Sequence, residues 1–113
     1  MAFEASLEMT DTGVARITLL GELDAASASR FKEAVESAAE HNPKHLVLLM
    51  EGLEFMASAG LRVLIFAKQK MGRDVDVYIV RARDPILETI RMTGFHHSVV
   101  LVEQQDTETI ESL

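Results

Sequence analysis

The stretch Glu54-Phe-Met-Ala-Ser-Ala-Gly-Leu-Arg-Val-Leu64 connects an apolar run to an amphipathic helix pattern. The run before it, His45-Leu-Val-Leu-Leu-Met50, is almost continuously apolar, which is typical of a central strand covered on at least one face. After Ser58 the apolar residues recur at helical spacing, and we expect this helix to end at Gly72. A buried strand that leads through a short loop into a helix is the repeating unit of α/β folds.

The rest of the chain alternates strand and helix patterns in the same way. We expect further strands at residues 3–10, 14–20, 75–80 and 97–102, the first two forming an antiparallel hairpin. Helices are expected at residues 25–41, 85–93 and 104–113, and loops at 21–24 and 51–56. This order predicts an α/β fold: a small, mostly parallel sheet of about four or five strands, with an N-terminal antiparallel hairpin strand and about four helices.

Length, charge and composition limit the classes of protein that fit. The 113 residues, 48% of them hydrophobic, suit a single domain that spans residues 1–113 and has one core. The net charge of −7 argues against binding to nucleic acid or to an anionic membrane, because both partners need a basic face. The chain has no cysteine, no signal-peptide pattern and no apolar run long enough to cross a bilayer, so we expect a cytoplasmic location without membrane insertion.

Ser58 is the residue best placed for chemistry. It lies at the predicted N-terminus of the second helix, where backbone N–H groups are unpaired and the helix dipole favours negative charge. A phosphoserine or a bound anion would be stabilised there. The simpler interpretation is that the hydroxyl is an ordinary N-cap, which stabilises a helix by roughly 1 kcal/mol.

The residues around Ser58 are candidates for contact with a partner protein. Gly60 permits a close approach of backbone, either to a partner or to a neighbouring strand. Of Phe55 and Met56, we expect one to anchor the loop inward and the other to be exposed. Asp24 is either a helix cap or a partner contact. The second helix also carries basic residues that form either a solvated face or a contact strip for an acidic partner: Arg62, Lys68, Lys70 and Arg73.

Nothing in the sequence predicts catalysis, a metal site or a cofactor. The four histidines have no ligand spacing with acidic residues. The glycines are isolated and form no phosphate-binding loop. No nucleophile–base pair is visible. We therefore expect a protein that is not an enzyme and that needs neither cofactor nor metal.

Three segments, taken together with their spacing, carry a family resemblance. They are Gly21-Glu-Leu-Asp24, the loop 51–56, and Ala57-Ser-Ala-Gly-Leu-Arg-Val-Leu64. Together they resemble the STAS domain, in the single-domain form of the anti-sigma factor antagonists. The resemblance covers nearly the whole chain and implies the same fold as the strand and helix patterns.

The resemblance also implies a regulatory function. Members of the family bind an anti-sigma factor that is also a serine kinase. Phosphorylation of one serine at the start of the second helix breaks the complex, and a serine phosphatase reverses it. Ser58 matches that serine. We predict partner contacts at Asp24, Phe55, Met56, Ala57, Ser58, Ala59, Gly60 and Arg62.

Two positions depart from the family pattern. Ala57 stands immediately before the serine and Leu49 at the end of the preceding strand, where aspartates are common; Ala59 replaces a second hydroxyl. The alternative function is therefore a non-catalytic STAS scaffold subunit of a larger signalling or lipid-transport complex, without phosphorylation. The identity of the partner and the oligomeric state stay open at this point.

Overall fold

The computed structural model of the protein describes residues 2–102. Six strands occur in this part of the chain: β1 (Glu4–Met9), β2 (Val14–Leu23), β3 (His45–Leu49), β4 (Leu53–Met56), β5 (Asp76–Val80) and β6 (Val100–Val102). The helices within it are α1 (Ala28–Glu40), α2 (Ser58–Met71), α3 (Asp84–Met92) and the short 3-10 helix η1 (Phe95–His97). The predicted α/β alternation is confirmed.

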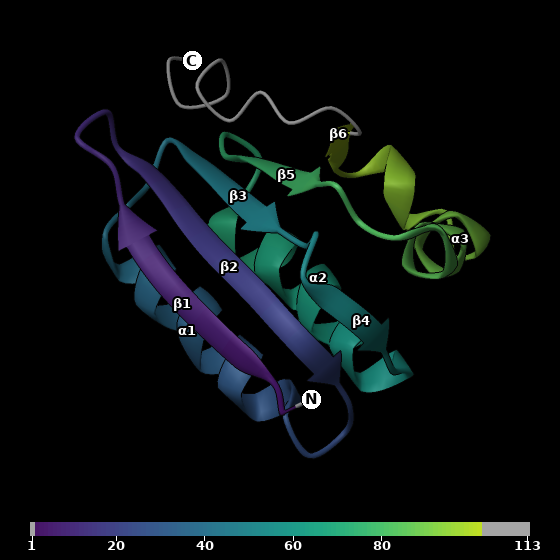
Figure 1. Ribbon diagram of the computed structural model, residues 1–113. Helices are drawn as coiled ribbons and strands as arrows, with labels where there is room; N and C mark the ends of the chain where they lie inside the picture. The colour runs from purple at the N-terminus through teal and green to yellow at the C-terminus, as the bar shows by residue number, and fades with distance from the viewer. Residues whose placement is uncertain (1, 103–113) are drawn as a thin grey trace.

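The strands form one mixed sheet in the order β1-β2-β3-β5-β6 (Figure 1). β1 pairs with β2 in the antiparallel direction, and the pairs β2–β3, β3–β5 and β5–β6 are parallel. β4 pairs with the last residues of β2, beyond the end of β3 (Figure 1). The prediction of about four or five strands was therefore too low, because residues 53–56 form a strand rather than the expected loop.

The predicted break at residues 21–24 was also wrong, since β2 continues to Leu23. Gly21 has a φ of +85°, which glycine adopts without strain, and the register shifts between Gly21 and Glu22. Gly21 lies opposite Leu53 and Glu22 lies opposite Phe55, so Glu54 is an additional residue on β4. This β-bulge turns both Leu53 and Met56 into the core and leaves the two residues between them exposed.

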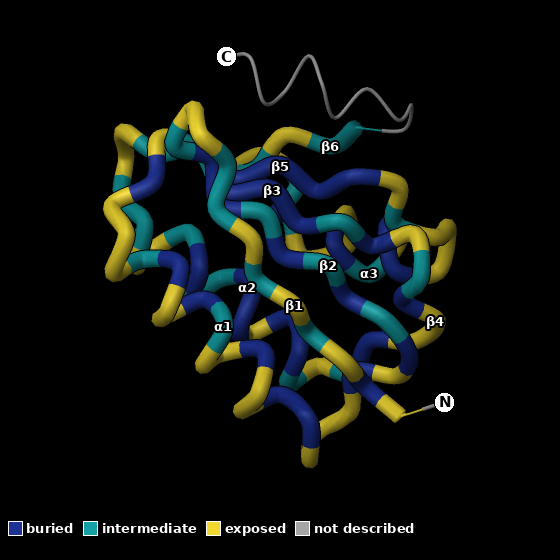
Figure 2. The backbone as a smooth tube through the Cα atoms, turned by 60° about the vertical axis from the view of Figure 1, so that its left-hand side comes forward, coloured by how far each residue is buried: buried dark blue, intermediate teal, exposed yellow. Residues whose placement is uncertain are grey.

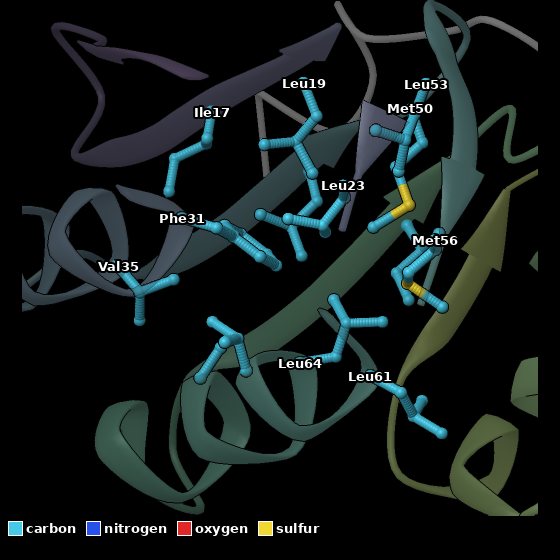
Figure 3. Packing of buried hydrophobic residues seen from close by; sticks show 14 of the residues in the cluster. Ile17, Leu19, Leu23, Phe31, Val35, Met50, Leu53, Met56, Leu61 and Leu64 are labelled. Carbon is cyan, nitrogen blue, oxygen red and sulfur yellow. The ribbon is translucent and has the colours of Figure 1, made fainter. Parts of the chain in front are cut away.

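The main core lies between the sheet and the two long helices, which cover the same face of the sheet (Figure 1). Phe31 and Val35 of α1 and Leu64 of α2 are fully buried against Ile17 and Leu19 of β2 (Figure 3). Their spacing follows the helical and strand periods read from the sequence. A smaller buried cluster on the opposite face contains Val14, Val47, Tyr78 and Val80.

Some predicted boundaries shift. α1 begins at Ala28 rather than residue 25, because residues 25–27 form a turn. The last strand begins at Val100 rather than residue 97, because residues 95–97 form the 3-10 helix η1. Three α-helices lie within the described residues. The predicted helix at 104–113, which would be the fourth, lies outside them.

Candidate functional site

The ends of β2 and β4 bring two distant segments together. The backbone N–H of Ala57 donates a hydrogen bond of 2.8 Å to the carbonyl of Leu23. The residues that follow, Asp24 and Ser58, therefore emerge at the same end of the sheet. Both are exposed. The two motifs singled out in the sequence thus form one surface, although 33 positions separate these residues in the numbering.

Ser58 is the first residue of α2, and its hydroxyl does not cap the helix. The N-cap is Ala57, whose backbone is extended and whose carbonyl accepts from the N–H groups of Gly60 and Leu61 at 2.9 and 3.2 Å. No side-chain hydrogen bond caps this end. The interpretation of Ser58 as an ordinary N-cap is therefore wrong, because the cap position falls one residue earlier.

The electrostatic setting of Ser58 suits an added negative charge on the helix itself. The first turn of α2 contains no acidic residue, so nothing there neutralises the positive end of the helix dipole. Basic residues in the last turn, Lys68 and Lys70, complement the opposite end. The ammonium of Lys68 also donates to the carbonyl of Val75 at 3.0 Å. Of the basic residues noted on this helix, Lys68 is therefore bonded within the protein itself.

Asp24 acts as a cap one turn before α1. Its Oδ1 accepts from the backbone N–H of Ser27 at 2.9 Å, and the hydroxyl of Ser27 accepts from the backbone N–H of Asp24 at 2.9 Å. This reciprocal pair has the spacing of a capping box but closes the turn of residues 25–27, and the N-cap of α1, Ser27, makes no side-chain cap hydrogen bond. Hydrogen bonds from the hydroxyl and the backbone N–H of Ser27 hold the pKa of Asp24 below its ordinary value of 3.8, so the carboxylate is ionised at neutral pH.

Phe55 and Met56 of β4 divide as expected. Phe55 is 48% exposed, whereas Met56 is 7% exposed and packs into the core (Figure 3). Gly60 is also buried: a Cβ atom there would lie 2.7 Å from Cδ2 of Leu23 and 2.8 Å from Cγ of Met56. The close approach predicted for Gly60 is therefore to the protein's own interior. Met56 and Gly60 support the surface rather than forming it.

The remaining predicted contacts form what we call the Ser58 surface: the exposed residues Asp24, Phe55, Ser58 and Arg62, with Ala57 and Ala59 partly exposed among them. Arg62 follows Ser58 by one helical turn and so lies on the same side of α2. Glu22 was not predicted to belong to the site, but it lies opposite Phe55 in the strand register. Its position between Gly21 and Asp24, both in a motif noted in the sequence, could have indicated this.

In the part of the chain that the structure describes, the other features show no arrangement typical of catalysis. A cavity of about 540 Å³ lies at the carboxyl ends of the strands, and in it Arg81 pairs with Glu51 at 2.5 Å. A carboxylate neutralised by a guanidinium is not a nucleophile–base pair. Within residues 2–102, no group of three or more His, Cys, Asp or Glu side chains is arranged to hold a metal ion. None of the helices in this range has the length and apolarity required to span a membrane.

Comparisons with known proteins agree with this geometry. The family model of the STAS domain matches residues 9–110. The anti-sigma-F factor antagonist RsfB of Mycobacterium tuberculosis is 30% identical over 82 residues, which are 73% of this chain and 67% of RsfB.

Solved structures share the fold. An anti-sigma factor antagonist from Mycobacterium paratuberculosis has a TM-score of 0.86 and 26% identity, covering 96% of this chain and 92% of that one. The Bacillus protein SpoIIAA in its phosphorylated form has a TM-score of 0.71 and 20% identity, covering 98% of both chains. At that identity, the second likeness concerns the fold alone.

Proposed function

The chain belongs to the STAS domain family, and from this premise we propose that it is an anti-sigma factor antagonist whose Ser58 surface binds an anti-sigma factor. The relative RsfB, which carries that function in its name, supports the proposal. The observation that carries it is the position of Ser58. Ser58 is exposed at the start of α2, outside the cap, at the same end of the sheet as the exposed Phe55 and the ionised Asp24.

The proposed switch is phosphorylation of Ser58 by the anti-sigma factor, acting as a serine kinase. A phosphate adds about −1.5 to −2 charges at neutral pH. The N-terminus of α2 tolerates this charge, so the folded protein is not disturbed. A partner packed against the Ser58 surface would instead have to bury a dianion beside Asp24, on a chain that already carries −7. The modification would therefore weaken the complex rather than unfold either protein.

The proposal includes the cellular setting of the switch. The kinase is the anti-sigma factor itself, a serine phosphatase restores the hydroxyl, and the exchange takes place in the cytoplasm. The protein has no catalytic role in this cycle. Ala57, which stands where an aspartate is common in the family, contributes no carboxylate to recognition of Ser58 by the kinase.

The test is a binding titration with the purified cognate anti-sigma factor. Wild type and Ser58→Ala should bind alike, and Ser58→Asp should bind at least about tenfold more weakly, because the interface must then accommodate an unpaired charge. Ser29→Asp is the matched control, since Ser29 is also an exposed serine in the first turn of a helix. Incubation of the wild type with ATP and the anti-sigma factor should add one phosphate-sized mass, and Ser58→Ala should gain none.

A different outcome would favour the scaffold function. The absence of aspartates at Ala57 and Leu49 is the observation that supports this second candidate. Equal binding by wild type, Ser58→Asp and Ser29→Asp, with no mass increase, would refute the phosphorylation switch. Co-purification of such an unmodified protein in a large, stable complex would then identify it as a subunit of that assembly.

A further inference from the structure

β1 is an open edge of the sheet. It pairs with β2 through six consecutive residue pairs, from Glu4 with Leu20 to Met9 with Ala15. Among residues 2–102, no strand pairs with its other side. An edge of this kind presents unpaired N–H and C=O groups to any strand that approaches. Residues 4–9 include no proline and no lysine, and their register is unbroken, so the charged side chains that limit pairing at this edge are those of Glu4 and Glu8.

A groove of about 640 Å³ runs beside this edge, between β1 and α1. One side is formed by residues 3–7, and the other side by α1 residues that include Glu33 and Ala34. Every second residue of β1 is half-buried, as Figure 2 shows by the alternation of exposed and intermediate segments. Ala5 and Leu7 belong to this half-buried set and pack with Ala34 against the core. The groove therefore offers half-buried apolar side chains, interspersed with Ser6 and Ser37, next to an unpaired backbone edge.

The rim of the groove is mainly acidic. Glu4 and Glu33 are exposed on its two sides. The one basic residue that lines it, Arg30, is placed over the ring of Phe3, with 5.6 Å between the guanidinium carbon and the ring centroid. A segment with basic side chains would therefore be favoured at the rim, while apolar side chains would be favoured against the half-buried apolar residues.

We propose that this groove binds an extended segment of a basic partner protein, which adds to β1 as a further strand. Main-chain hydrogen bonds to the edge supply affinity in this mode of recognition, and alternate side chains supply specificity. Apolar side chains of the segment contact Ala5, Leu7 and Ala34, and a basic side chain on this same face pairs with Glu33 of α1. The intervening Lys or Arg side chains point to the other face of the sheet, where Glu4 and Glu8 are exposed. A second copy of this chain fits less well, because it would bring two acidic rims and two net charges of −7 together.

The groove does not include Ser58, although Phe3 and Arg30 line both the groove and a neighbouring hollow that contains Asp24 of the Ser58 surface. β1 lies on one side of β2, whereas β4, which leads to Ser58, lies on the other (Figure 1). Because Ser58 lines neither hollow, we expect a partner in the groove to be insensitive to the state of Ser58. Ser58→Asp should bind a groove ligand as the wild type does, so that failure of one proposal leaves the other unaffected.

The experiment selects ligands from random ten-residue peptides displayed on phage, with the wild-type protein as bait. The enriched peptides should alternate β-branched or aromatic residues with Lys or Arg. A synthetic peptide of the enriched sequence is then titrated against Glu33→Arg and against Glu36→Arg. Both residues are exposed glutamates of α1, but only Glu33 lines the groove, so the net charge changes equally in the two variants.

Glu33→Arg should weaken peptide binding about tenfold, and Glu36→Arg should change it by less than about twofold. Peptide binding should also slow hydrogen exchange at amides of residues 4–9, as expected for strand addition. Equal effects of the two variants, or no protection of these amides, would overturn the proposal. So would a selection that enriches no peptide, or a dimer in sedimentation that Ala34→Arg abolishes, since the occupant would then be a second copy.

Discussion

Replacing Gly60 with alanine should destabilise the protein, although alanine is the better helix former. A Cβ atom at position 60 would lie 2.7–2.8 Å from atoms of Leu23 and Met56, closer than real Cβ contacts. Leu23 is fully buried and Met56 nearly so, so neither side chain can move out to solvent. Overpacking of this kind costs about 1–3 kcal/mol, and the gain in helix propensity returns up to about 1 kcal/mol.

The expected net loss is about 1–2 kcal/mol in the free energy of unfolding, which lowers Tm by about 4–8 °C for a domain of this size. Urea unfolding followed by circular dichroism measures it. The control is Leu23→Ala, which removes the Cγ and Cδ2 atoms that the new methyl group would meet. In that background, Gly60→Ala should cost less, because only the close contact with Cγ of Met56 remains, and the coupling should appear in a double-mutant cycle. A Gly60→Ala protein as stable as the wild type, or an equal cost in both backgrounds, would refute the reasoning.

The remaining predictions concern the core, the cap and the aromatic contact. Leu64→Ala should lower the free energy of unfolding, as measured by urea unfolding, by about 3 kcal/mol, because the side chain is fully buried and its removal leaves a cavity. The pKa of Asp24 is lower in the folded protein than its ordinary value of 3.8. The ionised carboxylate therefore stabilises the fold above pH 3.8, and this stabilisation is lost as the pH falls through the lowered pKa. The stability difference between wild type and Asp24→Asn should therefore shrink in acid, and a constant difference from pH 7 to pH 2 would contradict this. Phe55→Ala should change stability by less than about 0.5 kcal/mol, because Phe55 is a surface residue with about half of its area exposed. Calorimetric titration should nevertheless show weaker binding to the anti-sigma factor, and unchanged affinity would exclude the ring as a contact.

The sequence predicted the alternation of strands and helices because most elements carry clean periodicity. The apolar run at β3 and the helical spacing after Ser58 were sufficient to place a strand and a helix in order. β4 was not predicted, because its bulge breaks the strict alternation of apolar and polar residues by which a strand is recognised in a sequence. Gly21 was taken as a strand end for a related reason, since glycine at a bulge and glycine at a turn look the same in one sequence.

The candidate site was predicted in outline, but individual roles needed coordinates. Asp24 and Ser58 were both singled out, yet their proximity depends on the pairing of β2 with β4, which the sequence did not predict. Spacing also could not distinguish the outward position of Phe55 from the inward position of Met56. Gly60 shows the same difficulty, because the tight contact it permits is set by side chains from two other elements.

The bulge in β4 has a consequence for how such proteins diverge after duplication. Leu53 and Met56 hold the strand to the interior, while the two positions between them, Glu54 and Phe55, are exposed. Substitutions at this pair can alter charge, size and aromaticity beside Ser58 without repacking the interior. Paralogous copies in one cell can therefore acquire different partners through two neighbouring codons, and separate pathways can remain insulated while the scaffold keeps its stability.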